Sequence, residues 1–154
     1  MTKLAVIGGG STYTPELIDG VLGRRDRLPI TEIALCDIDQ ERLDIVAGFA
    51  RRMVSAAGGG IEIHTTTSQA EAVRGADFVV SQFRVGQQAA RHRDELLGRE
   101  FGLIGQETVG VGGFAKGLRT IPVALALADT ILDEAPHAIL LNFTNPAGMV
   151  TEAL

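Results

Sequence analysis

The sequence has little of several features that would place a chain in particular protein classes. It has no tryptophan, only 5% aromatic residues and one cysteine, and it has no run of basic residues. Its 14 lysines and arginines are outnumbered by 19 acidic residues, so the formal charge is −5. Because binding to a phosphate backbone needs a basic surface, we expect no nucleic-acid partner.

The single cysteine and the lengths of the apolar runs bear on the compartment. Cys36 cannot form an internal disulfide, and its neighbours Ala34 and Leu35 predict a buried, reduced thiol without a catalytic role. The first apolar run ends at Gly8, too early for a secretory signal, and the longest later run is interrupted by Asp129. We therefore expect a cytoplasmic protein without a membrane partner.

Short apolar runs alternate with longer amphipathic segments along all 154 residues. This alternation predicts an α/β fold that is Rossmann-like and doubly wound, with a mainly parallel sheet and helices on both faces, in one domain spanning 1–154. The expected strands are 4–7, 33–36, 61–63, 78–80 and 138–143, and the expected helices are 15–23, 40–57, 68–74, 86–100 and 117–135. The glycines at 58–60 predict a left-handed cap at the end of the second helix.

The stretch KLAVIGGGSTYTPEL, residues 3–17, joins a β-rich run to a helix start through three glycines. Thr14, followed by Pro15, has the pattern of an N-cap before a first-turn proline. The free N–H groups and the positive dipole end of such a helix form an anion site. We predict that four residues of this turn bind the pyrophosphate of a dinucleotide: Gly8, Gly10, Ser11 and Thr12. The alternative is a plain turn without a ligand.

Asp37 stands at the end of the next expected strand, where a dinucleotide site needs an acceptor for the ribose hydroxyls. A carboxylate there repels a 2′-phosphate, so Asp37 favours NAD over NADP. The sequence departs from the common fingerprint in two ways: the spacing to Asp37 exceeds the usual ~20 residues, and Tyr13 replaces the third glycine. A solvated strand end is the alternative interpretation of Asp37.

Five longer segments of the sequence resemble those of a known protein family. IGGGSTYTPEL, FRVG, GQETVGVGGF, LRTIP and NFTNPAGMVTEA together resemble the family 4 glycoside hydrolases, in their 6-phospho-β-glucosidase branch. The resemblance spans essentially the whole chain but only the N-terminal part of that family's longer chain. It implies a glycosidase in which NAD+ takes a hydride from sugar C3, a base removes the C2 proton, the C1 oxygen departs, water adds, and the hydride returns. A divalent metal ion, usually manganese, would polarise the C3 and C2 oxygens.

The resemblance assigns roles to two charged residues. Arg91 corresponds to a substrate-contacting arginine, and a guanidinium suits the oxygens of a phosphosugar. A solvated ion pair with Glu95, four residues later on a predicted helix, would explain Arg91 equally well. Glu107 corresponds to an acidic residue that supports the basicity of the catalytic tyrosine, and the alternative is a polar loop residue bonded to nearby backbone. The glycines of GVGG, which follow Glu107, predict a constrained loop.

Asn145 follows the last expected strand, at the sheet edge where ligands of α/β proteins bind. Its amide can donate to one sugar or cofactor oxygen and accept from another, and the resemblance places it among the substrate contacts. A turn-forming role before Pro146 is the alternative. The three histidines, His64, His92 and His137, show no metal-like spacing, so we assign no metal ligand in this chain.

The resemblance also implies what this chain lacks. The metal ligands, the acid and the catalytic tyrosine of the family lie beyond residue 154, so we expect the chain to be the N-terminal part of a longer enzyme and inactive alone. The whole enzyme would form a homo-oligomer and act on a phosphorylated disaccharide or aryl glucoside. Two alternatives stay open: a malate- or lactate-type NAD-dependent dehydrogenase, which should show an arginine-rich specificity loop and a later catalytic histidine, and a non-enzymatic NAD-sensing domain.

Overall fold

The computed structural model describes all residues, 1–154. The chain divides into two compact units. The first combines Met1–Phe83 with Thr130–Leu141, and the second combines Arg84–Asp129 with Asn142–Leu154. The prediction that residues 1–154 form one NAD-binding domain stays a prediction, and each unit is described by itself below.

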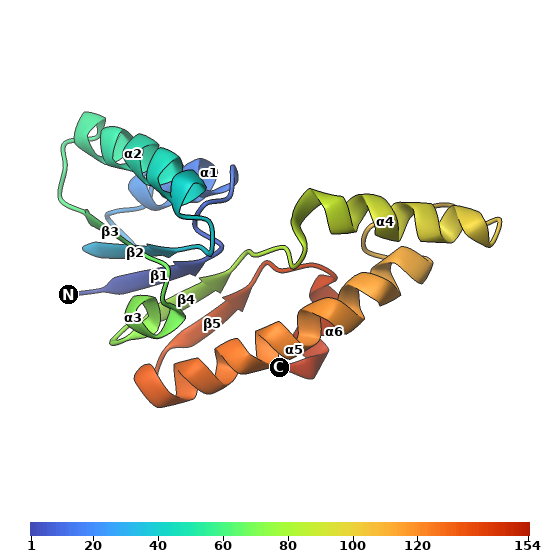
Figure 1. The fold of residues 1–154 in the computed structure, drawn as a ribbon. Helices are drawn as coiled ribbons and strands as arrows, with labels where there is room; N and C mark the ends of the chain where they lie inside the picture. The colour runs from blue at the N-terminus through green and yellow to red at the C-terminus, as the bar shows by residue number, and fades with distance from the viewer. The chain divides into compact units, whose positions relative to one another are not determined.

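The first unit is built on a five-stranded sheet in the order β3-β2-β1-β4-β5 (Figure 1). The strands are β1 (Lys3–Ile7), β2 (Glu32–Cys36), β3 (Glu62–Thr66), β4 (Phe78–Ser81) and β5 (Ile139–Asn142). β1 pairs in parallel with β2 and with β4, which brings Val6 opposite Leu35 on one side and Val80 on the other. The strand order reverses at β1, which is the place where ligands bind in doubly wound sheets.

Six helices accompany the strands: α1 (Thr14–Leu22), α2 (Gln40–Ala56), α3 (Gln69–Val73), α4 (Gln87–Glu100), α5 (Gly110–Glu134) and α6 (Ala147–Ala153). In the first unit α1 and α2 cover one face of the sheet and α3 lies on the other (Figure 1). The Rossmann-like α/β fold with a parallel sheet and helices on both faces is thus confirmed.

The core of the first unit lies between the sheet and the helix pair α1 and α2. Alternate strand residues face these helices, so Ile33 and Leu35 of β2 are fully buried together with Ile18 of α1 and Leu43 of α2. Burying each such side chain stabilises the fold by about 1.5–3 kcal/mol. This packing fixes the carboxyl ends of β1 and β2, from which the predicted cofactor residues extend.

The end of α2 confirms the predicted glycine cap. Gly58 has φ +91°, its N–H donates to Ser55 O, and the N–H of Gly59 donates to Val54 O at 2.8 Å. These two bonds form a Schellman motif, which satisfies carbonyls that the helix end would otherwise leave free.

The predicted cap of α1 is wrong. Thr14 is the first helical residue and fully buried, and the capping position falls on Tyr13, whose side chain makes no capping hydrogen bond. The Thr14 hydroxyl instead donates to Gly9 O at 2.9 Å and accepts from Gln82 Nε2 at 2.7 Å. Thr14 therefore ties the start of α1 to the glycine turn and to the end of β4.

Helix α5 begins at Gly110 rather than at residue 117, so the prediction of a constrained loop over GVGG is also wrong. A Cβ on Gly112 would lie 2.9 Å from Asp94 O and would collide with Gln106 O, and one on Gly113 would collide with Thr108. These glycines let the first turn of α5 approach neighbouring backbone closely, a packing role that a helix can accommodate despite the poor helix propensity of glycine.

By length and composition alone, α5 is apolar enough to cross a membrane. This is weak evidence, because core helices of soluble proteins meet the same criterion. Within the second unit, two basic residues of α5, Lys116 and Arg119, pair with Glu107 and Asp94. The absence of a membrane partner stays a prediction.

Candidate functional site

In the first unit the glycine turn after β1 is held tightly against the ends of two neighbouring strands. The N–H groups of Gly8 and Gly9 both donate to Cys36 O, at 2.8 and 2.7 Å. Gly8 has φ +94°, and a Cβ there would lie only 2.8 Å from Phe83 N. A Cβ on Gly9 would lie 2.9 Å from Leu35 Cβ. The turn therefore needs glycine at both positions, of which the sequence had singled out only Gly8.

The structure brings Asp37 directly beside this turn. Its Oδ2 accepts from the N–H of Gly10 at 2.9 Å, and its Oδ1 accepts from the N–H of Asp39 at 3.1 Å. Each carboxylate oxygen keeps further acceptor capacity, since an ionised carboxylate offers about four lone-pair sites. The half-buried Asp37 thus lies beside the glycine turn with acceptor capacity to spare, and its contact with ribose hydroxyls stays a prediction.

The start of α1 offers fewer free N–H groups than the sequence predicts. The N–H of Ser11 donates to Gly8 O, that of Tyr13 to Ser11 Oγ, and that of Thr14 to Ser11 O. Tight turns before the helix thus satisfy groups that a plain helix start would leave free. Thr12 keeps its N–H without a protein partner, so a phosphate would meet this donor and the hydroxyls of Ser11 and Thr12.

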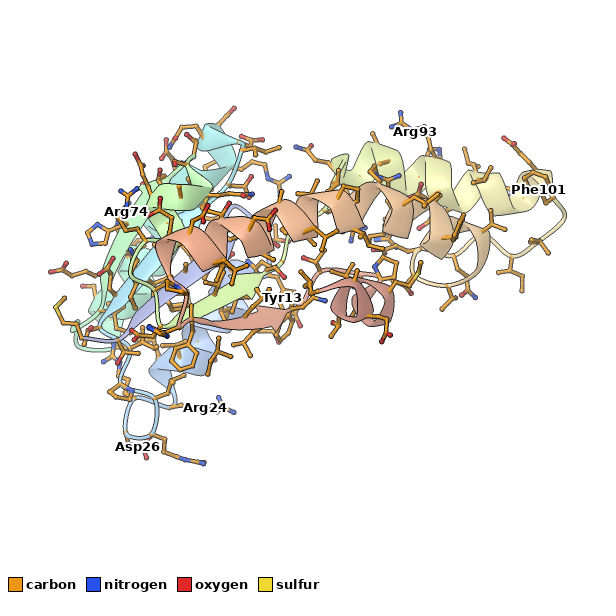
Figure 2. All side chains as sticks on the ribbon, turned by 90° about the horizontal axis from the view of Figure 1, so that it is seen from below. Tyr13, Arg24, Asp26, Arg74, Arg93 and Phe101 are labelled. Carbon is orange, nitrogen blue, oxygen red and sulfur yellow. The ribbon has the colours of Figure 1, made fainter.

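The exposure of Tyr13 explains how the turn accommodates this large residue in place of the third fingerprint glycine. Its side chain is 54% exposed and extends from the turn (Figure 2). The close contact with β2 is made by Gly9 instead, through Leu35. The departure from the common fingerprint therefore leaves the approach of turn and sheet intact.

In the second unit, four charged residues from four segments converge on one another. Glu107 lies in the connection between α4 and α5, and its Oε1 accepts from Arg84 Nη1 and from Lys116 Nζ, each at 2.5 Å. Arg91 of α4 approaches the other oxygen, with Nε 3.2 Å from Oε2. The structure thus joins Arg91 and Glu107, which the resemblance had named separately, and adds Arg84 and Lys116.

The structure shows the ion pair of Arg91 with Glu95, while its contact with substrate stays a prediction. Its Nε donates to Glu95 Oε1 at 2.8 Å, which is the ion pair expected on a helix. The terminal Nη groups make no hydrogen bond to the protein, and the side chain is 43% exposed. Because a guanidinium carries five N–H donors, one bond at Nε leaves its outer edge available to an oxyanion.

The cluster changes the acidity of its members. Burial raises the pKa of Glu107, but hydrogen bonds from Lys116 and Arg84 outweigh it, and the pKa lies below the ordinary value. Burial lowers the pKa of Lys116, and the hydrogen bond to Glu107 opposes this only in part because the charges of Arg84 and Arg91 add to the lowering. The lowered pKa of Glu107 thus follows from the cations around its carboxylate, and the lowered pKa of Lys116 follows first from burial and then from the neighbouring arginines.

A second ion pair supports the segment that carries Arg84. Arg119 of α5 bonds both oxygens of Asp94, at 3.2 and 2.6 Å, and its Nε donates to Val85 O at 3.0 Å. One feature of the sequence indicates this pair, since the acidic Asp94 lies on the otherwise apolar stripe of α4 between Ala90 and Gly98. An acidic residue on a buried helix stripe requires a partner.

Asn145 also lies in the second unit, after β5. Its Oδ1 accepts from the N–H of Ala147 at 3.3 Å, as expected of a turn-former, and its amide nitrogen makes no hydrogen bond. Asn145 makes no hydrogen bond or ion pair with the charged cluster. No group of three or more His, Cys, Asp or Glu residues in the chain could hold a metal ion.

Comparison with known proteins identifies the family. The model of the family 4 glycosyl hydrolases matches residues 3–154. The chain belongs to this family. It is 54% identical over 154 residues to a probable 6-phospho-beta-glucosidase of Bacillus subtilis, covering 99% of this chain and 35% of that protein. The chain thus spans about a third of the length of such relatives.

Solved structures agree with this assignment. The 6-phospho-beta-glucosidase of Thermotoga maritima, solved with manganese, NAD+ and glucose-6-phosphate, matches with a TM-score of 0.93 at 41% identity, over 99% of this chain and 36% of that one. Malate dehydrogenase from Salinibacter ruber matches with a TM-score of 0.63 at 14% identity, over 99% of this chain and 41% of that one. The latter likeness shows the fold alone.

Proposed function

We propose that this chain supplies the N-terminal third of an enzyme that hydrolyses 6-phospho-β-glucosides with the help of NAD+ and a divalent metal ion. The observation that carries the proposal is membership of family 4 along residues 3–154. The similarity to proteins named as 6-phospho-beta-glucosidases supports the β-linked substrate. The dehydrogenase alternative rests only on a shared fold.

The first unit fits NAD+. Gly8 and Gly9 allow the turn its close approach to the sheet, Thr12 offers an N–H, and Asp37 offers carboxylate oxygens beside Gly10. These groups would hold the pyrophosphate and the ribose hydroxyls. When bound, NAD+ would accept a hydride from sugar C3 and later return it.

The second unit fits a phosphorylated sugar. Arg91 would hold an oxyanion with its outer edge, and Asn145 would donate from its amide nitrogen to a sugar or cofactor oxygen. Glu107, held as a carboxylate, would accept the phenolic proton of the catalytic tyrosine that the family resemblance places beyond residue 154. That base would then remove the proton at sugar C2.

The chain's own residues form no cluster that would hold a metal ion, and we propose that the metal ligands lie beyond residue 154. We also propose a cytoplasmic location and a homo-oligomeric whole enzyme. A non-enzymatic NAD-sensing function is the second proposal. It is favoured by the fit of the first unit to NAD+, which needs no residue of the second unit.

The test uses the protein encoded by the whole gene. Cleavage of an aryl 6-phospho-β-glucoside should require both NAD+ and a divalent metal ion, should be slower with the α-anomer, and should slow further when sugar C2 carries deuterium. Glu107→Gln should lower kcat and enlarge that isotope effect, whereas Arg91→Ala should mainly raise KM. Cleavage without NAD+ or metal and without an isotope effect at C2 would refute the proposal.

A further inference from the structure

Lys116 differs from the other cations of the cluster in its burial. Its side chain is 3% exposed, whereas those of Arg84 and Arg91 are 29% and 43% exposed. The two arginines can exchange protein contacts for water, but a buried ammonium depends on the acceptor that the fold gives it. For Lys116 that acceptor is Glu107 Oε1.

The two oxygens of Glu107 have different surroundings. Oε1 accepts two hydrogen bonds, one from Lys116 and one from Arg84. Oε2 faces Arg91 Nε at 3.2 Å, and that nitrogen already donates to Glu95 at 2.8 Å. Since a carboxylate oxygen accepts about two bonds, Oε1 is saturated and Oε2 keeps acceptor capacity.

The ion pair between buried Lys116 and partly buried Glu107 is poorly explained by stability alone. Replacing a buried ion pair by apolar residues of similar volume is often neutral or stabilising, so such a pair is better understood as fixing a geometry. Glu107 needs such fixing because the connection between α4 and α5, in which it lies, has no regular secondary structure. The other end of this connection is also loosely packed, since Phe101 there is exposed (Figure 2). Lys116 attaches it to α5, and Arg84 attaches it to the segment after β4.

We propose that Lys116 and Arg84 are positioning residues that fix Glu107 through Oε1 and leave Oε2 to act on the approaching proton donor. This role rests on the proposed function of Glu107. The groups that face Glu107 are Arg84 from the segment after β4, Arg91 from α4 and Lys116 from α5, with Glu95 behind Arg91. Their surplus of positive charge keeps Glu107 ionised, so its Oε2 can accept a proton from the donor.

The first experiment measures the pKa of the Glu107 carboxyl group in this chain. With carboxyl-labelled glutamate and Glu107→Gln to assign the signal, carbon NMR follows its titration. Lys116→Met should raise the pKa of Glu107, and Lys116→Arg should restore it, because only the latter keeps the cation. Arg84→Gln, at a more exposed position, tests the same effect if Lys116→Met does not fold. The matched control is Arg93→Gln, because Arg93 is an exposed arginine of α4 outside the cluster (Figure 2). This substitution should leave the pKa of Glu107 unchanged.

The second experiment measures kcat and KM in the protein encoded by the whole gene. Lys116→Met should lower kcat by about 10²-fold, the loss caused by a displacement of about 1 Å at a reacting group, with KM changed less. The acidic limb of the pH profile of kcat should move to higher pH, and Lys116→Arg should partly restore both kcat and the position of this limb.

An unchanged Glu107 titration in a folded Lys116→Met or Arg84→Gln chain, or an unchanged kcat, would overturn the proposal. If the parent protein cleaves no phosphoglucoside, the proposed function fails, while the NMR titration still decides whether these cations fix Glu107.

Discussion

Replacing Gly8 by alanine tests whether close approach, rather than backbone conformation alone, fixes the turn after β1. Gly58 provides a matched control, because its φ of +91° is nearly that of Gly8 at +94°. A Cβ on Gly58 would have no atom within 4 Å, whereas one on Gly8 would lie 2.8 Å from Phe83 N and 2.9 Å from Gln82 O. The backbone atoms of Phe83 and Gln82 cannot move without displacing the end of β4.

The two substitutions should therefore differ in cost. Gly58→Ala should lower the free energy of unfolding by about 1–2 kcal/mol, the cost of a left-handed conformation in a residue with a Cβ. Gly8→Ala should lose this amount and about 1–3 kcal/mol more for overpacking. Urea unfolding followed by far-UV circular dichroism should separate the midpoints by about 1 M, given an m-value of about 1–3 kcal/mol/M. Equal midpoints for the two variants would refute the close-approach argument.

Three further predictions concern Asp37, Cys36 and Glu107. Calorimetry should show tighter binding of NAD+ than of NADP+, and Asp37→Ala should reduce this preference; equal binding of both dinucleotides to the parent chain would contradict it. Burial, and then the charges of neighbouring carboxylates, raise the pKa of Cys36 to about 11, so iodoacetamide at pH 8 should modify it slowly in the folded chain and rapidly in urea. Rapid modification without denaturant would argue against a buried thiol. Because the pKa of Glu107 is lower folded than unfolded, its contribution to stability is present above the ordinary value of 4.5 and is lost as pH falls through the folded value. Glu107→Gln should therefore lose less stability than the parent on acidification, and parallel unfolding curves of the two across this pH range would contradict the shift.

The sheet and most helices could be predicted because their signals are local. The apolar run at 33–36 became β2, which spans Glu32–Cys36, and the glycines at 58–60 ended α2 by the expected cap. The start of α5 could not be predicted, because glycine density has the same local meaning in a loop and in a closely packed helix. The close approach of Gly112 to Asp94 O is a tertiary contact that no short window of sequence contains.

The same limit explains which site residues the sequence missed. Gln82 reaches Gly8 O at 3.2 Å across 74 positions, and Lys116 reaches Glu107 from the second turn of a helix that was expected to begin later. Neither residue belongs to a motif with a known spacing. Asp37 was accessible to sequence reasoning because parallel strands place their carboxyl ends at one edge of the sheet.

The structural and functional interpretations of Arg91 and Asn145 were framed as alternatives, and their donors and acceptors show why they are compatible. Arg91 uses Nε for Glu95 and keeps its Nη groups, and Asn145 uses Oδ1 for the N–H of Ala147 and keeps its amide nitrogen. In each case the bond to the protein holds the side chain in one orientation, which reduces the entropy that a ligand would have to remove. A local bond that satisfies only part of a polar side chain is therefore an argument for a prepared binding group rather than against one.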